Sequence, residues 1–243
     1  MSTTAETRHT QALLEQNHFV LRRLHSLTGI IPVGAFLIEH LLTNAGAWYS
    51  AERYNRDVKW IQELPFLTVL EFGFIIIPLA FHAIYGVVIA WGSQPNAATY
   101  PYMRNTRYRL QRITAWITLV FVIVHLLKFR FAYLLGGPVF AEAQDWFELT
   151  RRGLLHWHIG AFGVPAWFTL TFYVIGLTAA VYHFGNGIWT FGISWGILGG
   201  PEAQRWFSYV CLLVGIVLAV WGYMSLYGFV VNEPIPAGAL VPG

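Results

Sequence analysis

The sequence predicts an all-α integral membrane protein, built as a bundle of five transmembrane helices. Of its 243 residues, 56% are hydrophobic and 11% are charged, whereas roughly a quarter of an ordinary soluble domain is charged. Five apolar runs also reach the length of about 20 helical residues that crosses a hydrocarbon core about 30 Å thick. The net charge of +3 is too small and too scattered to indicate a nucleic-acid partner.

The predicted spans form one domain between two polar ends. Aromatic residues such as Trp48, Trp91 and Trp206 gather at the span ends, as in the interfacial belts of membrane proteins. The connection at 136–164 mixes charged and aromatic residues, so we expect an amphipathic helix in the membrane interface. Pro32 and Pro78 lie inside spans and predict local kinks. The expected layout is a polar head at 1–21, a transmembrane domain at 22–231 with spans at about 24–42, 66–91, 113–135, 165–191 and 206–231, and a tail at 232–243.

Arginines beside the first span favour a cytoplasmic N-terminus in the cell membrane. Arg22 and Arg23 stand directly before that span, and positive residues are enriched on the cytoplasmic side of membrane helices. The connection at 92–112 would lie on the same side. It carries Arg104, Arg107, Arg109 and Arg112. Counted together, the lysines and arginines divide almost evenly, eight on the cytoplasmic side and seven on the other, so the orientation depends on the residues that flank the first span.

A single cysteine, Cys211, excludes several kinds of site. The chain cannot form an internal disulfide, and it cannot hold a Cys-ligated iron–sulfur cluster or a Cys-rich zinc site. It also lacks the Cys-x-x-Cys-His pattern that attaches a c-type haem. Because Cys211 lies in an apolar run, we expect a buried structural thiol.

Four histidines, one in each of four consecutive spans, carry the functional signal. A polar group without a partner is costly inside a membrane, so intramembrane ionisable residues indicate function. One such histidine could be a satisfied core residue, but coincidence does not account well for four. His40 and His125 lie about 27 Å and about 20 Å from the inner, cytoplasmic end of their helices. His82 and His183 lie about 13 Å and about 12–15 Å from it, so the four form an outer pair and an inner pair.

Two stacked pairs of neutral imidazoles suit two bis-His haems of the b type enclosed by the bundle. Imidazole is a good axial ligand to haem iron, whereas zinc would need two further ligands at each pair. Gly86, Gly185 and Gly187 stand close to the histidines. They are consistent with a flat macrocycle against the helices, although glycine in a membrane helix also serves plain packing.

A positive, hydroxyl-bearing patch precedes the first span. Arg22, Arg23, His25 and Ser26 could hold haem propionates or a quinone carbonyl. The equally weighted alternative is a snorkelling cap on a membrane helix. His9 and His18 are expected to be solvated in the polar head, and His156 and His158 to be structural residues of the interface.

The sequence resembles a known family, the diheme cytochrome b membrane anchor of bacterial succinate dehydrogenase. The similarity is to the single-anchor class found with menaquinone in Gram-positive and related bacteria. It covers residue 22 to about 205, but not the head, the 136–164 connection or the tail. The matching segments are Arg22-Arg-Leu-His-Ser-Leu-Thr-Gly, Phe36-Leu-Ile-Glu-His40, Pro78-Leu-Ala-Phe-His82-Ala-Ile-Tyr-Gly, Leu110-Gln-Arg-Ile-Thr reaching His125, and His183-Phe-Gly-Asn-Gly-Ile-Trp.

The resemblance implies a role in a respiratory complex. The four haem ligands of the family fall on His40, His82, His125 and His183, and the family pairs its first with its third and its second with its fourth. A flavoprotein subunit would oxidise succinate and an iron–sulfur subunit would relay the electrons. This chain would anchor both in the lipid membrane and pass electrons through its haems to a quinone, expected to be menaquinone. The soluble subunits would dock against Arg22, Arg23 and the 104–112 stretch.

Quinone reduction consumes protons, and three carboxylates near the outer pair are candidates to handle them: Glu39, Glu63 and Glu71. Each could instead be a hydrogen-bonded structural acid. The related diheme fumarate reductases carry a glutamate two residues before the fourth ligand, implicated in proton movement. This chain has Val181 there, so that proton route is not expected.

Three other functions remain open from the sequence. The complex could run as a quinol:fumarate reductase. The chain could be the diheme cytochrome b of another respiratory enzyme, such as a hydrogenase or a formate dehydrogenase. It could also be a haem-free transporter that uses intramembrane histidine and glutamate for protons.

Overall fold

The computed structural model describes residues 17–92, 103–159 and 162–234. Within this described part, five helices are long and apolar enough to cross a membrane, which confirms the predicted all-α, five-span architecture. They are Asn17–Trp48, Leu67–Trp91, Asn105–Lys128, Ala166–Ser194 and Pro201–Val231. His9 of the polar head lies outside the described residues.

Shorter elements interrupt or connect the spans. The first span contains α2 and ends in the 3₁₀ turn η1, and the second contains a π-helical turn, η2. The short strands β1 and β2 pair antiparallel, with His158 opposite Gly163. The order is α2 (Pro32–Asn44), η1 (Ala45–Trp48), α3 (Ala51–Gln62), α4 (Leu67–Leu70), η2 (Glu71–Ile76), α5 (Ile77–Trp91), α6 (Met103–Lys128), η3 (Ala132–Leu135), η4 (Phe140–Glu142), α7 (Trp146–Leu155), β1 (His158–Ile159), β2 (Phe162–Gly163), α8 (Ala166–Ser194) and α9 (Pro201–Val231).

Both intramembrane prolines coincide with irregular backbone, as predicted. The first helix has a turn at Ile31, and Pro32 occupies the first turn of α2. Pro78 lies in the first turn of α5, directly after the π-helical turn. Proline has no backbone N–H to donate, so a regular α-helical ladder cannot continue through it.

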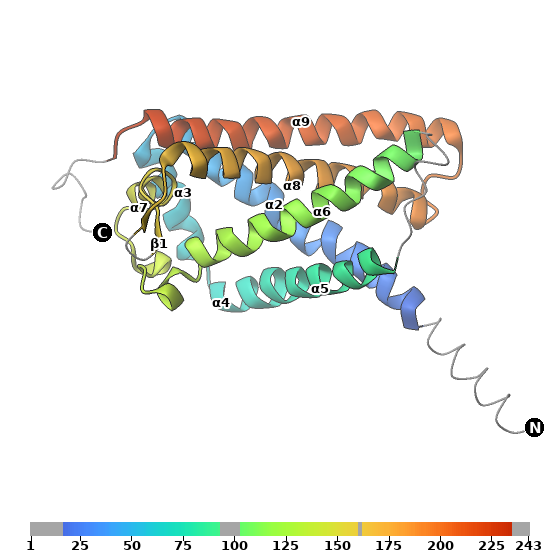
Figure 1. Ribbon diagram of the computed structural model, residues 1–243, viewed down its shortest axis with the longest axis horizontal. Coiled ribbons are helices and arrows are strands. Elements are labelled where there is room, and N and C mark those ends of the chain that lie inside the picture. Colours follow the sequence, from blue (N-terminus) through green and yellow to red (C-terminus); the bar gives the residue numbers. More distant parts are fainter. Residues whose placement is uncertain (1–16, 93–102, 160–161, 235–243) are drawn as a thin grey trace, which may run out of the picture.

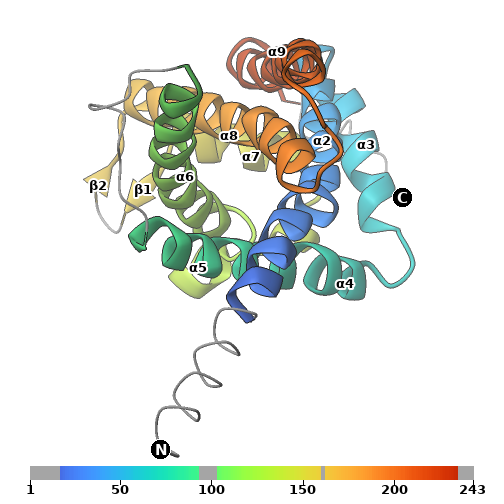
Figure 2. The same ribbon diagram turned by 90° about the vertical axis from the view of Figure 1, so that its right-hand side faces the viewer.

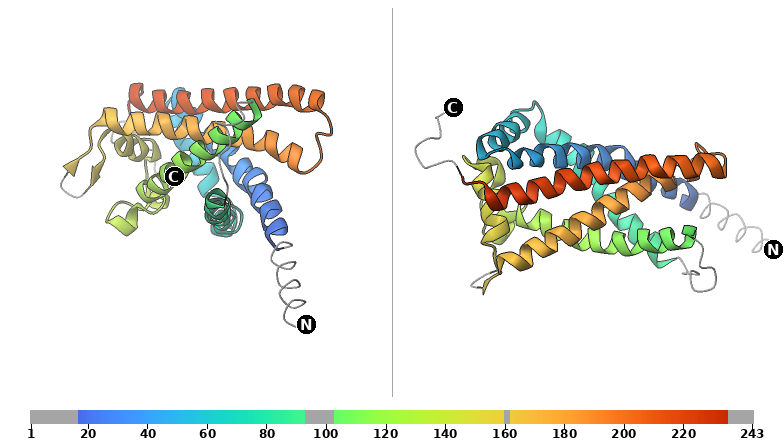
Figure 3. Two further views of the ribbon diagram at one scale, coloured as in Figure 1. Left: turned by 45° about the vertical axis from the view of Figure 1, so that its right-hand side comes forward. Right: turned by 90° about the horizontal axis from the view of Figure 1, so that it is seen from above.

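The helices are arranged around a common axis. In the end-on view of Figure 2, the first helix, α5, α6 and α8 surround this axis, and α9 lies outside it. α8 packs against α6 on one side and against α9 on the other, and α9 also contacts α2 and η1. Figure 3 shows α8 and α9 side by side in both views. The four histidine-bearing helices are therefore those around the axis.

One end of the bundle is closed by α3 and α7, which lie together opposite the start of the first helix (Figure 1). Asn55 of α3 donates to Asp145 Oδ1 (2.9 Å) and accepts from the backbone N–H of Phe147 (2.9 Å). The Tyr54 hydroxyl bonds Thr150 of α7 at 3.2 Å. Burial raises the pKa of Tyr54 to about 12, so this contact stays neutral at physiological pH. We call this region the α3–α7 end.

The structure differs from the prediction at the start of the third span. α6 covers Met103–Lys128, so the stretch 104–112 that was predicted as a connection is helical. Two of its arginines reach partners without leaving the helix, since Arg107 lies over the Trp189 ring (4.7 Å) and Arg112 donates to the Ala90 carbonyl. Hydropathy marks where a helix leaves the hydrocarbon and does not mark where it ends. The connection at 136–164 contains a helix, α7, as predicted, and its location in the membrane interface stays a prediction.

α3 was not predicted, although the sequence carries a start signal for it. The Ser50 side chain accepts from the backbone N–H of Arg53 and caps the helix. Asp145 caps α7 in the same way. Cys211 is buried, as predicted. It lies on α9, where α8 approaches closely at Gly185.

Gly228 is the closest approach of α9 to η1. A Cβ atom at this position would lie 2.3 Å from the carbonyl oxygen of Ala47. We expect Gly228→Ala to lower the free energy of unfolding by about 1–3 kcal/mol, because backbone atoms cannot yield to it. Gly215→Ala on the same helix is the control, since its Cβ would meet Val181 at 3.8 Å. Thermal unfolding followed by circular dichroism measures both variants, and equal midpoints would contradict the prediction.

Candidate functional site

The structure brings the four intramembrane histidines together as two pairs. The ring centroids of His40 and His125 are 5.7 Å apart, with the ring planes at 82°. Those of His82 and His183 are 6.2 Å apart, with the planes at 84°. These are the pairs that helix depth predicts. The assignment of the rings as iron ligands stays a prediction.

Polar contacts at the Nδ1 atom orient three of the four imidazole rings. His82 Nδ1–H donates to the carbonyl of His25 at 2.9 Å, and His183 Nδ1–H donates to the carbonyl of Gln111 at 3.2 Å. His125 Nδ1 lies 3.3 Å from the Tyr173 hydroxyl. A carbonyl partner fixes the proton on Nδ1 and leaves the Nε2 lone pair available, as in metal-bound histidines.

The two pairs lie at different depths in the bundle. Both contact α8, the His82–His183 pair through His183 itself and the His40–His125 pair through Tyr173. These residues are ten positions apart on α8, which separates the pairs by about 15 Å along the helix. The His40–His125 pair is the one nearer the α3–α7 end.

Gln111 was not predicted as a site residue, yet it holds His183 from two directions. Its carbonyl accepts from the His183 ring, and its side-chain amide donates back to the His183 carbonyl at 3.1 Å. Its Oε1 accepts from Asn186 Nδ2 at 2.8 Å. The sequence did contain a signal for this contact, because the amide side chains of Gln111 on α6 and Asn186 on α8 lie inside or beside apolar runs.

His25 is part of the His82–His183 site. Its ring stacks on His82 at a centroid distance of 4.0 Å and an interplanar angle of 10°. Its Nδ1 is buried and has no hydrogen-bond partner among the described residues. Gly29 and Gly86 permit this approach, because Cβ atoms there would lie 2.4 Å from His82 and 3.0 Å from His25.

The three glycines near the histidines face other protein elements. Gly86 faces the His25 ring, and Gly185 faces the backbone of Cys211 on α9, with its Cβ position 3.2 Å from that carbonyl oxygen. A Cβ at Gly187 would lie 3.7 Å from Gln111. The glycines therefore lie at contacts between protein elements, and their role beside a macrocycle stays a prediction.

The arginine patch divides in the structure. Ser26 accepts from Trp195 Nε1 at 2.9 Å and donates to the Arg23 carbonyl at 3.0 Å. The Arg23 guanidinium lies between the rings of Phe19 (5.1 Å) and Trp195 (4.9 Å). Ser26 and Arg23 thus join the first helix to the end of α8. Arg22 is exposed.

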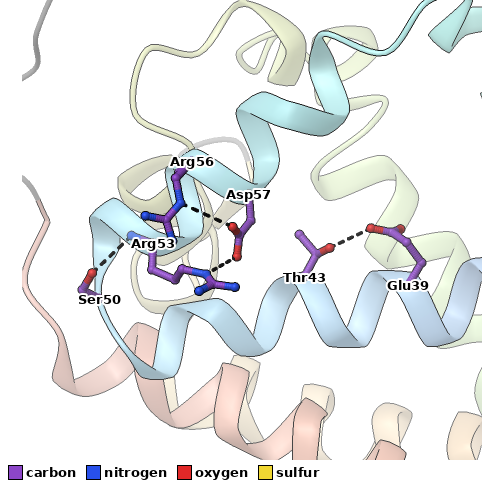
Figure 4. Close-up of polar contacts among 6 residues, drawn as sticks. All are labelled: Glu39, Thr43, Ser50, Arg53, Arg56 and Asp57. Carbon is purple, nitrogen blue, oxygen red and sulfur yellow. Dashed lines mark hydrogen bonds and ion pairs between the residues drawn. The ribbon is translucent and has the colours of Figure 1, made fainter.

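The three candidate carboxylates have different surroundings. Glu71, in the π-helical turn, forms a two-pronged ion pair with Arg130, whose Nη2 donates to Oε2 at 2.8 Å. This pairing raises the pKa of Arg130. Glu39 is exposed and accepts from Thr43 at 2.7 Å, as Figure 4 shows. Glu63 is largely exposed and lies 3.9 Å from Lys59. In the described part of the chain, each of these carboxylates bonds a different partner and none bonds another.

The remaining histidines are consistent with structural or solvated positions. His18 is exposed and its ring bonds the Tyr85 hydroxyl at 2.9 Å. His158 Nδ1–H donates to the carbonyl of His156 at 2.9 Å, at an exposed site between α7 and β1.

The paired rings fit a haem better than a metal ion bound by protein alone. No group of three or more His, Cys, Asp or Glu side chains in the described ranges could hold a metal ion. Two imidazoles without a third or fourth donor suit an iron whose other positions a macrocycle fills. The donor set is compatible with haem b.

Comparison with known proteins decides the family. No family model matches the chain. The chain is 40% identical over 212 residues to the succinate dehydrogenase cytochrome b558 subunit of Bacillus subtilis (strain 168). This match covers 87% of the chain and 97% of that protein. The chain belongs to the family of succinate dehydrogenase cytochrome b subunits. The membership favours the succinate dehydrogenase interpretation over a transporter or the cytochrome of another respiratory enzyme.

This cytochrome b subunit lacks a polar group at the position of the fumarate reductase glutamate. Val181 is 5% exposed and belongs to an apolar cluster with Leu41, Leu177, Phe184 and Leu218. A carboxylate here would lose its hydration without gaining a described partner. The surroundings of Val181 are thus apolar, and the absence of the fumarate reductase proton route stays a prediction.

Proposed function

We propose that this chain anchors succinate dehydrogenase in the cell membrane and conducts electrons from an iron–sulfur subunit to a quinone through two haem b groups. The observation that carries the proposal is the presence of two separate intramembrane histidine pairs in a member of this family. A single pair would support only one bis-His haem. Two pairs about 15 Å apart along α8 would extend an electron path through much of the bundle.

We assign His82 and His183 to the inner haem and His40 and His125 to the outer one. When bound, haem iron supplies one-electron redox chemistry. The residues of the chain orient the ligands and set their surroundings. The carbonyls of His25 and Gln111 hold the inner imidazoles, and Tyr173 contacts the His125 ring. Such partners fix the tautomer of a ligand and raise its basicity.

Three candidates to contact a haem propionate or a quinone carbonyl lie beside the inner pair: His25, Arg23 and Ser26. His25 is the strongest candidate for a propionate or a quinone carbonyl, because its buried Nδ1 has no partner in the described part of the chain. Ser26 already accepts a hydrogen bond from Trp195, and the Arg23 guanidinium lies over the Trp195 ring. Arg22 is exposed and available to a partner subunit.

The soluble partners are a flavoprotein and an iron–sulfur subunit. A chain with one buried cysteine cannot hold the clusters that relay electrons from the dicarboxylate site. We place both partners at the end opposite α3 and α7, beside Arg22 and the start of α6. That end faces the cytoplasm if the positive flank of the first helix sets the orientation.

The quinone, which we infer to be menaquinone, would react near the His40–His125 pair. Glu71 is the best placed of the three candidate acids, since it is partly buried and lies in a π-helical turn. Such turns often occur at functional sites. Glu39 and Glu63 are exposed and would act only as proton carriers from outside the bundle.

Haem analysis and spectroscopy of the purified complex test the proposal. We expect two haem b per cytochrome subunit, both reduced by succinate, with a flavoprotein and an iron–sulfur protein co-purifying. Absence of a reduced b-type absorption band would contradict the cytochrome function. A stoichiometry of one haem would contradict the two-pair assignment while leaving the family intact.

A further inference from the structure

Lys128 is a partly buried lysine whose ammonium has no partner among the described residues. It is one of two lysines in the chain, the other being Lys59. Its Nζ atom is shielded from solvent and has no hydrogen-bond partner among the described residues. A lysine near a helix end normally extends its ammonium to water at the membrane surface. Lys128 does not, although it is the last residue of α6.

Three aromatic rings enclose the ammonium instead. Nζ lies 4.4 Å from the ring centroid of Trp157, 5.0 Å from that of Tyr173 and 5.7 Å from that of Phe129. Ring faces attract a cation, but they do not replace the hydrogen bonds that three N–H donors lose on burial. A buried ammonium is retained in proteins where an anion pairs with it. The enclosure therefore indicates an anionic ligand.

The position of Lys128 identifies that ligand. It follows His125 by one helical turn, on the same face of α6. The Tyr173 ring beneath the ammonium belongs to the residue whose hydroxyl contacts the His125 ring. Lys128 also lies on the side of His125 that faces the α3–α7 end, because α6 ends there. An anion bound by Lys128 must therefore lie directly beside the His40–His125 pair.

We propose that Lys128 binds a propionate carboxylate of the haem held by His40 and His125, and that this contact raises the reduction potential of that haem. The inference rests on the proposed function, since it requires a haem at this pair. A carboxylate would satisfy the ammonium with charge-assisted hydrogen bonds. A neighbouring positive charge stabilises the reduced iron, which carries one positive charge fewer. The competing oxygen ligand is a quinone carbonyl, which is a neutral acceptor and would leave the charge of the ammonium uncompensated.

Redox titration of the complex tests the proposal, because it measures the reduction potential of each haem, which catalytic activity does not report. In Lys128→Met, we expect the ratio of reduced to oxidised haem at the His40–His125 pair to fall at least tenfold at fixed ambient potential. For a one-electron couple this equals a downward shift of 59 mV. The haem at His82–His183 should keep its potential. Lys128→Arg should restore most of the shift, because it retains the charge.

Lys59→Met is the matched control. Lys59 lies on α3, at the same end of the bundle, but its side chain is 53% exposed, so solvent and salt screen its charge. This variant should leave both potentials unchanged. Titrations of quinone-depleted complex, with and without added menaquinone, separate the two oxygen sources. A shift that appears only with menaquinone present would assign Lys128 to the quinone and overturn the propionate contact.

Amine labelling of the wild-type complex provides a measurement that does not depend on a folded variant. With a water-soluble acetylating reagent and peptide mass spectrometry, Lys59 should react and Lys128 should be protected. Comparable reaction of both lysines would overturn the proposal, as would unchanged haem potentials in Lys128→Met. These outcomes differ from failure of the proposed function, which would appear as missing haem in the wild-type complex.

Discussion

Replacing His82 or His183 with alanine should remove the same haem, and replacing His40 or His125 should remove the other. Each variant is expected to keep one of two haem b groups, because a bis-His site that loses one axial ligand binds its haem far more weakly. The ring pairs at 6.2 Å and 5.7 Å provide the grouping. Haem content and low-temperature difference spectra of the purified complex measure the effect.

The spectra must show which component is lost, since stoichiometry alone cannot test the pairing. His82→Ala and His183→Ala should delete one common band component, with the other component unaltered in position. His156→Ala is the control, because His156 is exposed at the end of α7 and has no assigned role in haem binding. If His40→Ala and His82→Ala delete the same component, the pairing is wrong.

Helix depth predicts the grouping of the histidines because it depends only on the rise of an α-helix. His40 and His125 remain on one level even when span ends shift by several residues, as they do for α6. Helix depth does not predict which groups contact the Nδ1 atoms of these histidines. Those contacts depend on which backbone carbonyl faces each ring, and the carbonyls of His25 and Gln111 carry no side-chain signal in the sequence.

The position of His25 is a second case where sequence reasoning stops short. The sequence places it beside Arg22 and Arg23 at the membrane surface, and it weighs a snorkelling cap equally with a ligand contact. In the structure the ring turns inward and stacks on His82. Glycine on both helices allows this, because side chains at Gly29 and Gly86 would overlap the two imidazoles. Such complementarity between helices follows from three-dimensional packing and not from periodicity.

Charges at the α3–α7 end were also only partly predictable. Hydropathy places Lys128 and Arg130 toward the outer end of the third predicted span. It cannot show that Arg130 pairs with Glu71, 59 residues earlier, while Lys128 remains enclosed by aromatic rings. Arg130 is thus paired within the protein, whereas the Lys128 ammonium two residues earlier has no partner in the described part of the chain.

Glu71→Gln is expected to slow quinone reduction by about 10²-fold while both haems remain bound. The glutamine keeps the size and hydrogen-bonding ability of the side chain but cannot exchange a proton near neutral pH. A positioned acid or base commonly contributes about 10²–10⁴-fold to a rate. The measurement is steady-state reduction of a menaquinone analogue by succinate, together with the haem content of the same preparation. Glu142→Gln, an exposed carboxylate on η4, should change the rate less than twofold.

Arg130→Gln separates proton handling from the ion pair. It breaks the same contact but leaves the Glu71 carboxylate in place. If Glu71 moves protons, Arg130→Gln should retain much more activity than Glu71→Gln, and the double variant should resemble Glu71→Gln. Equal losses in the two single variants would assign the effect to the ion pair and remove Glu71 from the proton route. The comparison is decisive because residues in one ion pair are coupled, so only the full cycle isolates the contribution of each group.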